Sequence, residues 1–405
     1  MARSNTVPMP DRSSGRFGDR IQKSKWFNLS SGFDMYFFVL LMIILVVGLA
    51  TLYSASHVYA FNYEDGDSYF YIRKQLLWTA IGLSGMLVVS MFDYHILHKF
   101  AWGLWFASLG LLLVALVMPS EMGVHRWIRI PGLGQFQPSE LAKFALVLLF
   151  AHLISLNYKR MNKFKTGFAP LFVLLCITCG LVVIEPHLSG TMLIASLGMM
   201  MMFVGGVQKR WLVGTIGLAV VGVVFMVLVL GYEQDRISVW FHPLESFANE
   251  ITFDDGISGH DHAWQTVQSL YAIGSGGLMG QGPGNSRQKH LFLPEPQNDF
   301  IFSIFCEEMG FIGAVMVLLL FALLVWRGLK IALKAPDKFG FMLALGLTAQ
   351  IGLQVAINVA VVSNLMPNTG ISLPFFSYGG TSVLMLLLQM GVVLSISRQS
   401  RMEKI

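Results

Sequence analysis

Three acidic residues that lie close together offer the most specific chemistry in this sequence. They are Asp299, Glu307 and Glu308, in the stretch LFLPEPQNDFIFSIFCEEMG at positions 291–310. A carboxylate inside a membrane span costs roughly 2.5–3.5 kcal/mol on insertion scales, so one is seldom kept without a partner or a use. Asp299 follows a proline-broken loop and precedes an apolar run, where it can act as a general base toward a hydroxyl group. The alternative role for Asp299 is structural, as the cap of the following helix.

The apolar run after Asp299 predicts one unbroken helix from position 300 to about position 326, which is long enough to span a bilayer. Either Asn298 or Asp299 would cap its first turn. At 1.5 Å per residue, Glu307 and Glu308 would lie roughly 12 Å deeper in the membrane than Asp299.

Basic residues near the same side of the membrane suggest binding of an anionic substrate. Lys143 follows Glu140 by three positions in QPSELAKFALVLL, so the two share a helix face, and they either pair with each other or leave Lys143 for a phosphate. Arg73 and Lys74 open another apolar run at the same depth, and Arg236 begins a long loop. Orientation rules disfavour cations on the outer side, which strengthens the phosphate interpretation.

Two further polar groups interrupt apolar sequence. Glu185 and His187 flank a proline in IEPHLSGT, where a structural role for the histidine is favoured over a catalytic one. Gln350, Gln354 and Asn358 recur at four-residue spacing, so they form one polar stripe that must face other helices or a wet cavity.

Composition determines the fold class that must position these groups. The chain has 405 residues, of which 55% are hydrophobic and 13% charged, against about 25% charged in soluble domains. These values predict an all-α polytopic membrane protein, and a net charge of only +5 does not indicate nucleic-acid binding. We expect ten spans, at about 33–54, 75–92, 100–118, 138–156, 167–184, 188–206, 211–231, 300–326, 341–363 and 378–397.

The distribution of basic residues predicts the orientation of the chain. Most of the 28 lysines and arginines fall on one side of the ten spans, which the positive-inside rule assigns to the cytoplasm together with both termini. We therefore expect a basic, flexible cytoplasmic tail at 1–32, a membrane domain at 33–397 and a cytoplasmic tail at 398–405. The long loop between spans seven and eight, at about 232–298, is then extracytoplasmic.

Five motifs carry a resemblance to a known family. They are QPSELAK (137–143), RISVWFHP (236–243), QSLYAIGSGGLMGQG (268–282), LPEPQNDFIF with CEEMG, and PNTGISLPFFSYGGTS (367–382). In this order they resemble the SEDS family, named for shape, elongation, division and sporulation. GPGNSRQKHLFLPEP is similar to the FtsW-like division and sporulation branch more than to the elongation branch. One departure is plain, because the family often has Q-P-D-L-G-T where this chain has EPHLSG, with His187 at the acidic position.

The resemblance implies a peptidoglycan glycosyltransferase that polymerises lipid II at the outer face of the bacterial cytoplasmic membrane, at the division septum or in sporulation. It implies a class B penicillin-binding protein and other division proteins as partners. A divalent cation would assist, although no ligand set for one is legible in the sequence.

The resemblance also assigns roles to residues. The catalytic aspartate of the family is matched by Asp299. Gln268 and Ser377 lie in the matching motifs, and we expect them in substrate binding together with Lys143, Glu140, Arg73, Lys74 and Arg236. The supporting positions around the site are Glu307, Glu308, Glu185, His187 and Asn358.

Two other functions fit the residues. Intramembrane carboxylates, broken helices and outer cations also suit a transporter that flips lipid II. A scaffold that only recruits division proteins would use the basic N-terminal tail. Spacing alone leaves enzyme and transporter near parity, and the family resemblance favours the enzyme.

Overall fold

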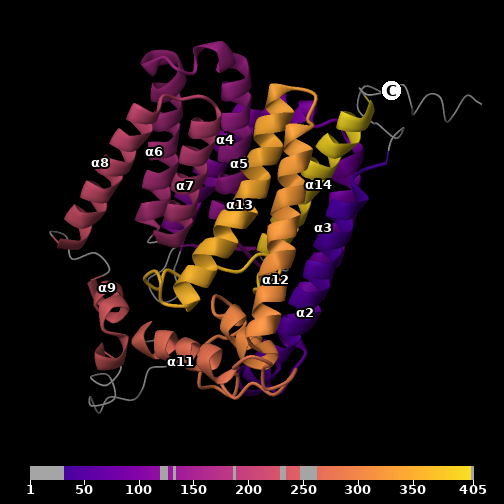
Figure 1. The fold of residues 1–405 in the computed structure, drawn as a ribbon, viewed down its shortest axis with the longest axis vertical. Coiled ribbons are helices and arrows are strands. Elements are labelled where there is room, and N and C mark those ends of the chain that lie inside the picture. The colour runs from indigo at the N-terminus through magenta and orange to yellow at the C-terminus, as the bar shows by residue number, and fades with distance from the viewer. Residues whose placement is uncertain are drawn as a thin grey trace, which may run out of the picture.

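The structure is a computed structural model that describes residues 32–118, 126–130, 134–185, 188–228, 234–246 and 262–402. The predicted tail at 1–32 lies outside the described residues except for its last position. In the described part of the chain, each of the ten predicted spans overlaps one helix of a single bundle (Figure 1). These helices are α2 (Met35–Tyr63), α3 (Phe70–Met91), α4 (His95–Val117), α5 (Pro138–Asn157), α6 (Ala169–Ile184), α7 (Leu188–Val204), α8 (Lys209–Leu228), α12 (Ile301–Leu333), α13 (Lys338–Val362) and α14 (Gly380–Met402).

The chain is a polytopic membrane protein, as its composition predicted. Among the described residues, eight helices are long and apolar enough to cross a bilayer, and α7 is a shorter apolar helix of 17 residues. The number of ten crossings therefore stays a prediction. The bundle is packed unevenly, because about two thirds of α5 and α14 is buried inside the protein but only 28% of α3 and α4.

The polar stripe predicted on α13 faces the interior of the bundle. Gln350, Gln354 and Asn358 are all at most 1% exposed. Gln354 donates to the carbonyl of Ser372 at 3.0 Å, so the stripe holds the irregular segment that follows α13. Irregular backbone at membrane depth is tolerated where it is buried in protein in this way.

α12 is not the single unbroken helix that the sequence predicted. Gly310 has φ 66° and ψ −171°, and it divides α12 into a first limb at 301–309 and a second limb at 311–333. A Cβ at Gly328 would meet Thr348, and one at Gly352 would meet Val325, so the second limb runs antiparallel to α13.

The first limb runs the other way along α13. Asn358 Nδ2 donates to the carbonyl of Asp299 at 2.9 Å, and Ser269 Oγ joins the Ser303 hydroxyl to the carbonyl of Val362. Position 299 thus meets position 358, and position 303 meets position 362. Since both numbers rise together, this limb runs parallel to the end of α13. The expectation that Glu307 and Glu308 lie deeper in the membrane than Asp299 assumed an unbroken helix and is wrong.

The predicted helix cap is also wrong. α12 begins at Ile301, and its N-cap residue Phe300 makes no side-chain capping bond. Asn298 Nδ2 donates instead to Glu295 Oε2 at 2.7 Å. Asp299 is therefore not needed to start the helix, which leaves its carboxylate available for another role.

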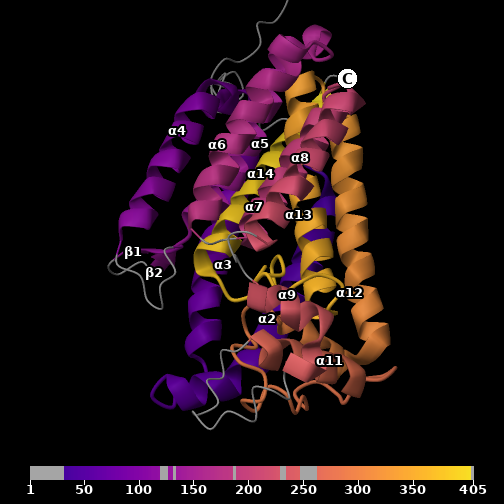
Figure 2. The same ribbon diagram turned by 90° about the vertical axis from the view of Figure 1, so that its left-hand side faces the viewer.

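Two groups of short elements lie at the end of the bundle where α13 finishes. The segment predicted as a long loop contains α9 (Gln234–Phe241) and α11 (His262–Ser275), followed by turns from 276 to 300. The stretch that contains Trp127 leads into a hairpin of β1 (Ile128–Ile130) and β2 (Gly134–Phe136). Figure 2 shows this hairpin toward the same end of the bundle as α9 and α11.

Candidate active site

Asp299 lies at the junction of α13, the turn that follows it and the first limb of α12. Asn358 Nδ2 donates to the carbonyls of both Asp299 and Ile371, at 2.9 and 2.7 Å, so one buried amide fixes both segments. Gly370 has φ 67°, and a Cβ built on it would lie 3.0 Å from Asp299 Oδ2. Asp299 is partly buried, and its carboxylate lies directly against backbone that only glycine adopts without strain.

The surroundings of Asp299 make its carboxylate a stronger base than usual. Burial, and then the negative charge of Glu295, raise the pKa of Asp299 to about 6, while the positive charges of Arg126 and Arg236 act to lower it. A general base works best when its pKa lies near the working pH. Asp299 is therefore mostly ionised at pH 7 and still able to hold a proton.

Arg236 reaches this site from α9. Its Nη1 donates to the carbonyl of Asn368 at 3.2 Å, two residues before the glycine that borders Asp299. Asn368 in turn donates to Gln265 of α11, and Trp240 Nε1 donates to the carbonyl of Asn364. α9 is thus docked on the turn after α13, which explains how a residue distant in sequence acts on Asp299.

Arg126 acts on two carboxyl groups at once. Its charge lowers the pKa of Asp299 and also that of Glu185, at the end of α6. Glu185 is 1% exposed, neither of its oxygens has a hydrogen-bond partner among the described residues, and burial raises its pKa to about 8. Ser189 of α7 donates to the carbonyl of Gly370, so the α6–α7 turn borders the same site. The other predicted residue of this turn, His187, lies outside the described residues.

The structure brings the remaining predicted cations into other contacts. Lys143 Nζ lies 2.6 Å from Glu140 Oε1, and both side chains are buried, so the predicted pair forms. Arg73 pairs with Asp67 at 2.8 Å and is 69% exposed, while Lys74 lies over the ring of Phe70. The described contacts do not join any of these three cations to Asp299, and their roles in substrate binding stay predictions.

Gln268 and Ser377 lie where their side chains can stabilise the fold. Gln268 is buried in α11, and Ser377 Oγ accepts a hydrogen bond from the Leu373 amide at 2.8 Å, which closes the turn before α14. Substrate binding by these two residues also stays a prediction.

Sequence reasoning did not assign site roles to Arg126 and Glu295. Arg126 belongs to the HRWIRI stretch, and Glu295 belongs to the proline-broken loop before Asp299. The one sequence feature that could have identified them is that both are charged residues on the expected outer side. The choice among several outer cations depends on tertiary contacts that spacing does not encode.

The described residues do not offer an evident cation site. No group of three or more His, Cys, Asp or Glu side chains among them could hold a metal ion. Asp299 and Glu295 alone would leave most of the coordination to substrate and water, as Mg²⁺ permits. The divalent cation stays a prediction.

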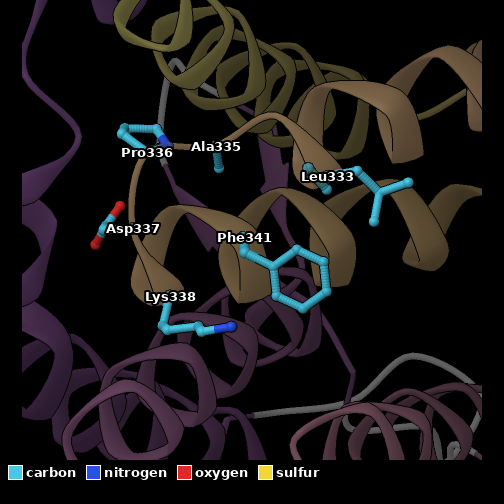
Figure 3. Close-up of a pocket in the computed structure, with 7 residues that line it drawn as sticks. Leu333, Ala335, Pro336, Asp337, Lys338 and Phe341 are labelled. Carbon is cyan, nitrogen blue, oxygen red and sulfur yellow. The ribbon is translucent and has the colours of Figure 1, made fainter. Parts of the chain in front are cut away.

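A cavity of about 410 Å³ lies far from this site, at the turn that joins α12 to α13 (Figure 3). It is lined by Ala332, Leu333, Ala335, Pro336, Asp337, Lys338 and Phe341. Because the cavity is at the start of α13 and Asp299 is near its end, about 30 Å of helix separates them.

Comparison with known proteins decides the family. A family model for cell cycle proteins of the FtsW, RodA and SpoVE type matches residues 34–402. The chain belongs to this family. The resemblance to the SEDS family is thereby confirmed.

Its relatives cover nearly the whole chain. Stage V sporulation protein E of Bacillus subtilis (strain 168) is 40% identical over 91% of this chain and 98% of its own length. The probable peptidoglycan glycosyltransferase FtsW of Geobacter sp. (strain M18) is 35% identical over the same shares of the two chains.

Solved structures show the same fold. A chain from a peptidoglycan synthase complex, described as coordinating polymerization and crosslinking, superposes with a TM-score of 0.72 at 25% identity, over 92% of this chain and 99% of that one. The rod shape determining protein RodA of Thermus thermophilus gives a TM-score of 0.64 at 27% identity, over 92% and 98%. The all-helical membrane fold predicted from the sequence is therefore confirmed.

Proposed function

We propose that this member of the FtsW/RodA/SpoVE family is a peptidoglycan glycosyltransferase. It polymerises lipid II into glycan strands during cell division or sporulation. Support comes from the relatives named peptidoglycan glycosyltransferase, which are matched over nine tenths of this chain. The observation that carries the proposal is the partly buried Asp299, whose carboxylate is acted on by the charges of two arginines and whose pKa is raised to about 6.

Asp299 acts as the general base. The hydroxyl of the acceptor sugar attacks the anomeric carbon of the donor sugar, and the hydroxyl proton passes to Asp299. The bond from the anomeric carbon to the diphosphate oxygen breaks, so the polyprenyl diphosphate leaves with the bonding electrons. General-base catalysis of this kind contributes typically about 10²–10⁴-fold. Asn358 and Gly370 hold the base in place, because one fixes its backbone and the other lies against its carboxylate.

Arg126 and Arg236 stabilise the leaving group. Charge develops on the diphosphate as the bond breaks, and preorganised cations stabilise that charge more in the transition state than in the ground state. These arginines are the cations that act on Asp299, whereas Lys143 is already paired with Glu140. Arginine also binds phosphate oxygens through two parallel hydrogen bonds.

The reaction would take place at the outer face of the cytoplasmic membrane. Support comes from the positive-inside rule, which assigns the side with most of the lysines and arginines to the cytoplasm. That side includes the turn before α13, whereas Asp299 lies near the other end of α13. The partner that crosslinks the strands would be a class B penicillin-binding protein, and the supporting observation is the fold shared with a chain of a polymerising and crosslinking complex. Other division proteins and the septal location belong to the same proposal.

The test is polymer formation from lipid II by the purified protein, with and without a co-purified penicillin-binding protein. Asp299→Ala should lower the rate by about 10²-fold or more, because the base is removed. Glu245→Gln is the matched control, since Glu245 is an exposed carboxylate in the same outer segment. An Asp299→Ala protein that stays folded and polymerises at the parent rate would refute the assignment. Movement of labelled lipid II across vesicles without any new glycosidic bond would instead support the transporter.

A further inference from the structure

Lys289 is a buried lysine that the proposed reaction does not use. It is 1% exposed, and its ammonium nitrogen has three acceptors, at 3.0 Å from Glu308 Oε1, 3.2 Å from Ser54 Oγ and 2.5 Å from the carbonyl of Gly284. Three acceptors satisfy all three N–H donors of an ammonium group. Ser54 also donates to Glu308 at 2.6 Å, so the contacts form a closed network.

This network joins three parts of the fold that are distant in sequence. Ser54 belongs to α2, Glu308 to the first limb of α12, and Lys289 to the turns between α11 and α12. We call Lys289, Glu308 and Ser54 the lysine clamp. Figure 1 shows these turns gathered around the lower ends of α2 and α12, where the clamp lies.

Glu307 fixes the same turns from the next position of the limb. It accepts hydrogen bonds from the Ser286 hydroxyl and from the backbone amides of Arg287 and Gln288. The two adjacent carboxylates therefore hold opposite ends of one short segment, because Glu307 binds its backbone and Glu308 binds its lysine. Glu307 and Glu308, which the sequence analysis singled out, are thus both paired with the turns between α11 and α12.

The segment from the clamp to Asp299 is conformationally strained. Leu291 and Glu295 have φ of 68° and 45°, in the left-handed region that non-glycine residues rarely adopt. Such residues persist only when the surrounding structure over-determines them, and they cluster at active sites. The far end of this segment is held by Asn358 and by Tyr378, whose amide donates to the carbonyl of Gln297 at 2.8 Å.

We propose that Lys289 is a positioning residue for Asp299. The lysine clamp holds one end of the strained segment against α2 and α12, so that the other end presents the base to the substrate hydroxyl. This role rests on the proposed function, since Asp299 must be the base for its position to affect catalysis. Without the clamp the segment relaxes toward ordinary φ values and the carboxylate leaves its place beside Gly370.

Two variants separate positioning from the cost of a buried charge. Lys289→Met removes the clamp and leaves Glu308 buried without its cation, which by itself destabilises a protein. The double variant Lys289→Met with Glu308→Leu replaces the ion pair by apolar side chains, which is often neutral for stability, yet it still lacks the bonds to Ser54 and Gly284. Lys334→Met, at the exposed cytoplasmic end of α12, is the matched control.

Hydrogen exchange and kinetics are measured on the same full-length proteins in detergent or nanodiscs. We expect amide exchange of residues 290–299 to rise about 10-fold or more in both clamp variants. Polymerisation of lipid II should lose about 10–100-fold in kcat with KM within about twofold, because a displacement of about 1 Å can cost about 10²-fold. The control should match the parent in both measurements.

The pH dependence of kcat/KM distinguishes positioning from a general loss of stability, which would not shift its acidic limb. Glu295, Arg126 and Arg236 are the charged groups that act on Asp299, together with its burial. A carboxylate that leaves this buried place should titrate nearer its ordinary value, so the acidic limb of kcat/KM should shift to lower pH in the double variant.

The outcomes decide the proposal in each case. Raised exchange at 290–299 with lowered kcat and a shifted acidic limb supports the clamp. Parent-like exchange or parent-like kcat in the double variant overturns it, and this test stands even if Lys289→Met alone does not fold. If the parent protein makes no glycan even with its co-purified penicillin-binding protein, the proposed function fails, and the exchange data still show whether Lys289 holds the segment.

Discussion

Gly370→Ala is the substitution that tests the geometry of the base most directly. Gly370 has φ 67°, and an added Cβ would lie 3.0 Å from Asp299 Oδ2. Ordinary contacts of a Cβ begin near 3.4 Å, so the carboxylate must move by at least 0.4 Å, the difference between the two distances. The left-handed backbone adds a strain of about 1–2 kcal/mol for a non-glycine residue.

The expected loss of activity follows from that displacement. A shift of about 1 Å costs about 10²-fold, so a shift of about half that size should lower kcat by about 10-fold. In free energy this is about 1.4 kcal/mol on the barrier. KM should change little, because the arginines that we propose to bind the diphosphate do not contact the added methyl group among the described contacts.

Gly206→Ala is the matched control for backbone strain. Gly206 also has a positive φ, of 92°, but the nearest atom to an added Cβ is Met161 Cβ at 3.9 Å, in a turn between α7 and α8. Thermal midpoints and lipid II polymerisation are measured for both variants. Both should lose similar stability, and only Gly370→Ala should lose kcat. If Gly370→Ala polymerises within twofold of the parent, or if Gly206→Ala loses as much, the close contact with Asp299 does not matter for catalysis.

Three further predictions concern the same site. The polymerisation rate should rise with pH through about 6 as Asp299 ionises, which a profile of kcat/KM measures; an inflection near 4 would contradict the raised pKa. Arg126→Gln or Arg236→Gln should lower kcat by about 10²-fold and move that inflection to higher pH, because each arginine lowers the pKa of Asp299; unchanged profiles would remove them from the site. Gly310→Ala should lower the free energy of unfolding by about 2 kcal/mol or more, because its Cβ would lie 2.3 Å from the Gly280 nitrogen at a positive φ. The thermal midpoint measures this loss, and a midpoint equal to that of the parent would refute the break in α12.

Features encoded by local spacing were predictable from the sequence. Asp299 stood out because a proline-broken loop meets an apolar run there, which is visible within a few residues. The buried stripe of Gln350, Gln354 and Asn358 followed from four-residue periodicity, and the Lys143–Glu140 pair followed from three-residue spacing. Helix positions followed from apolar length in the same way.

Features that depend on distant contacts were not predictable. Gly310 in CEEMGF looks like any glycine of an apolar helix, and its break is stabilised by backbone bonds from a different segment, since the amides of Phe311 and Ile312 donate to the carbonyls of Gly277 and Leu278. From the sequence, several cations on the outer side were equally good candidates for acting on Asp299. Only the docking of α9 and the position of the β1–β2 hairpin bring Arg236 and Arg126, rather than Arg73, to act on Asp299.

The break at Gly310 has a consequence for how a membrane neighbour would influence the chemistry. Phe311, Met316 and Trp326 are more than half exposed on the second limb, where another transmembrane segment or lipid would touch the protein. The first limb joins that surface covalently at one glycine, through main-chain bonds to residues 277–282, and through Phe305, which packs on Phe376 together with Phe321 of the second limb. Alanine scanning would therefore interrupt only the aromatic route between the limbs and leave the peptide groups intact, whereas proline or backbone-ester replacement at 277–282 would interrupt the main-chain route.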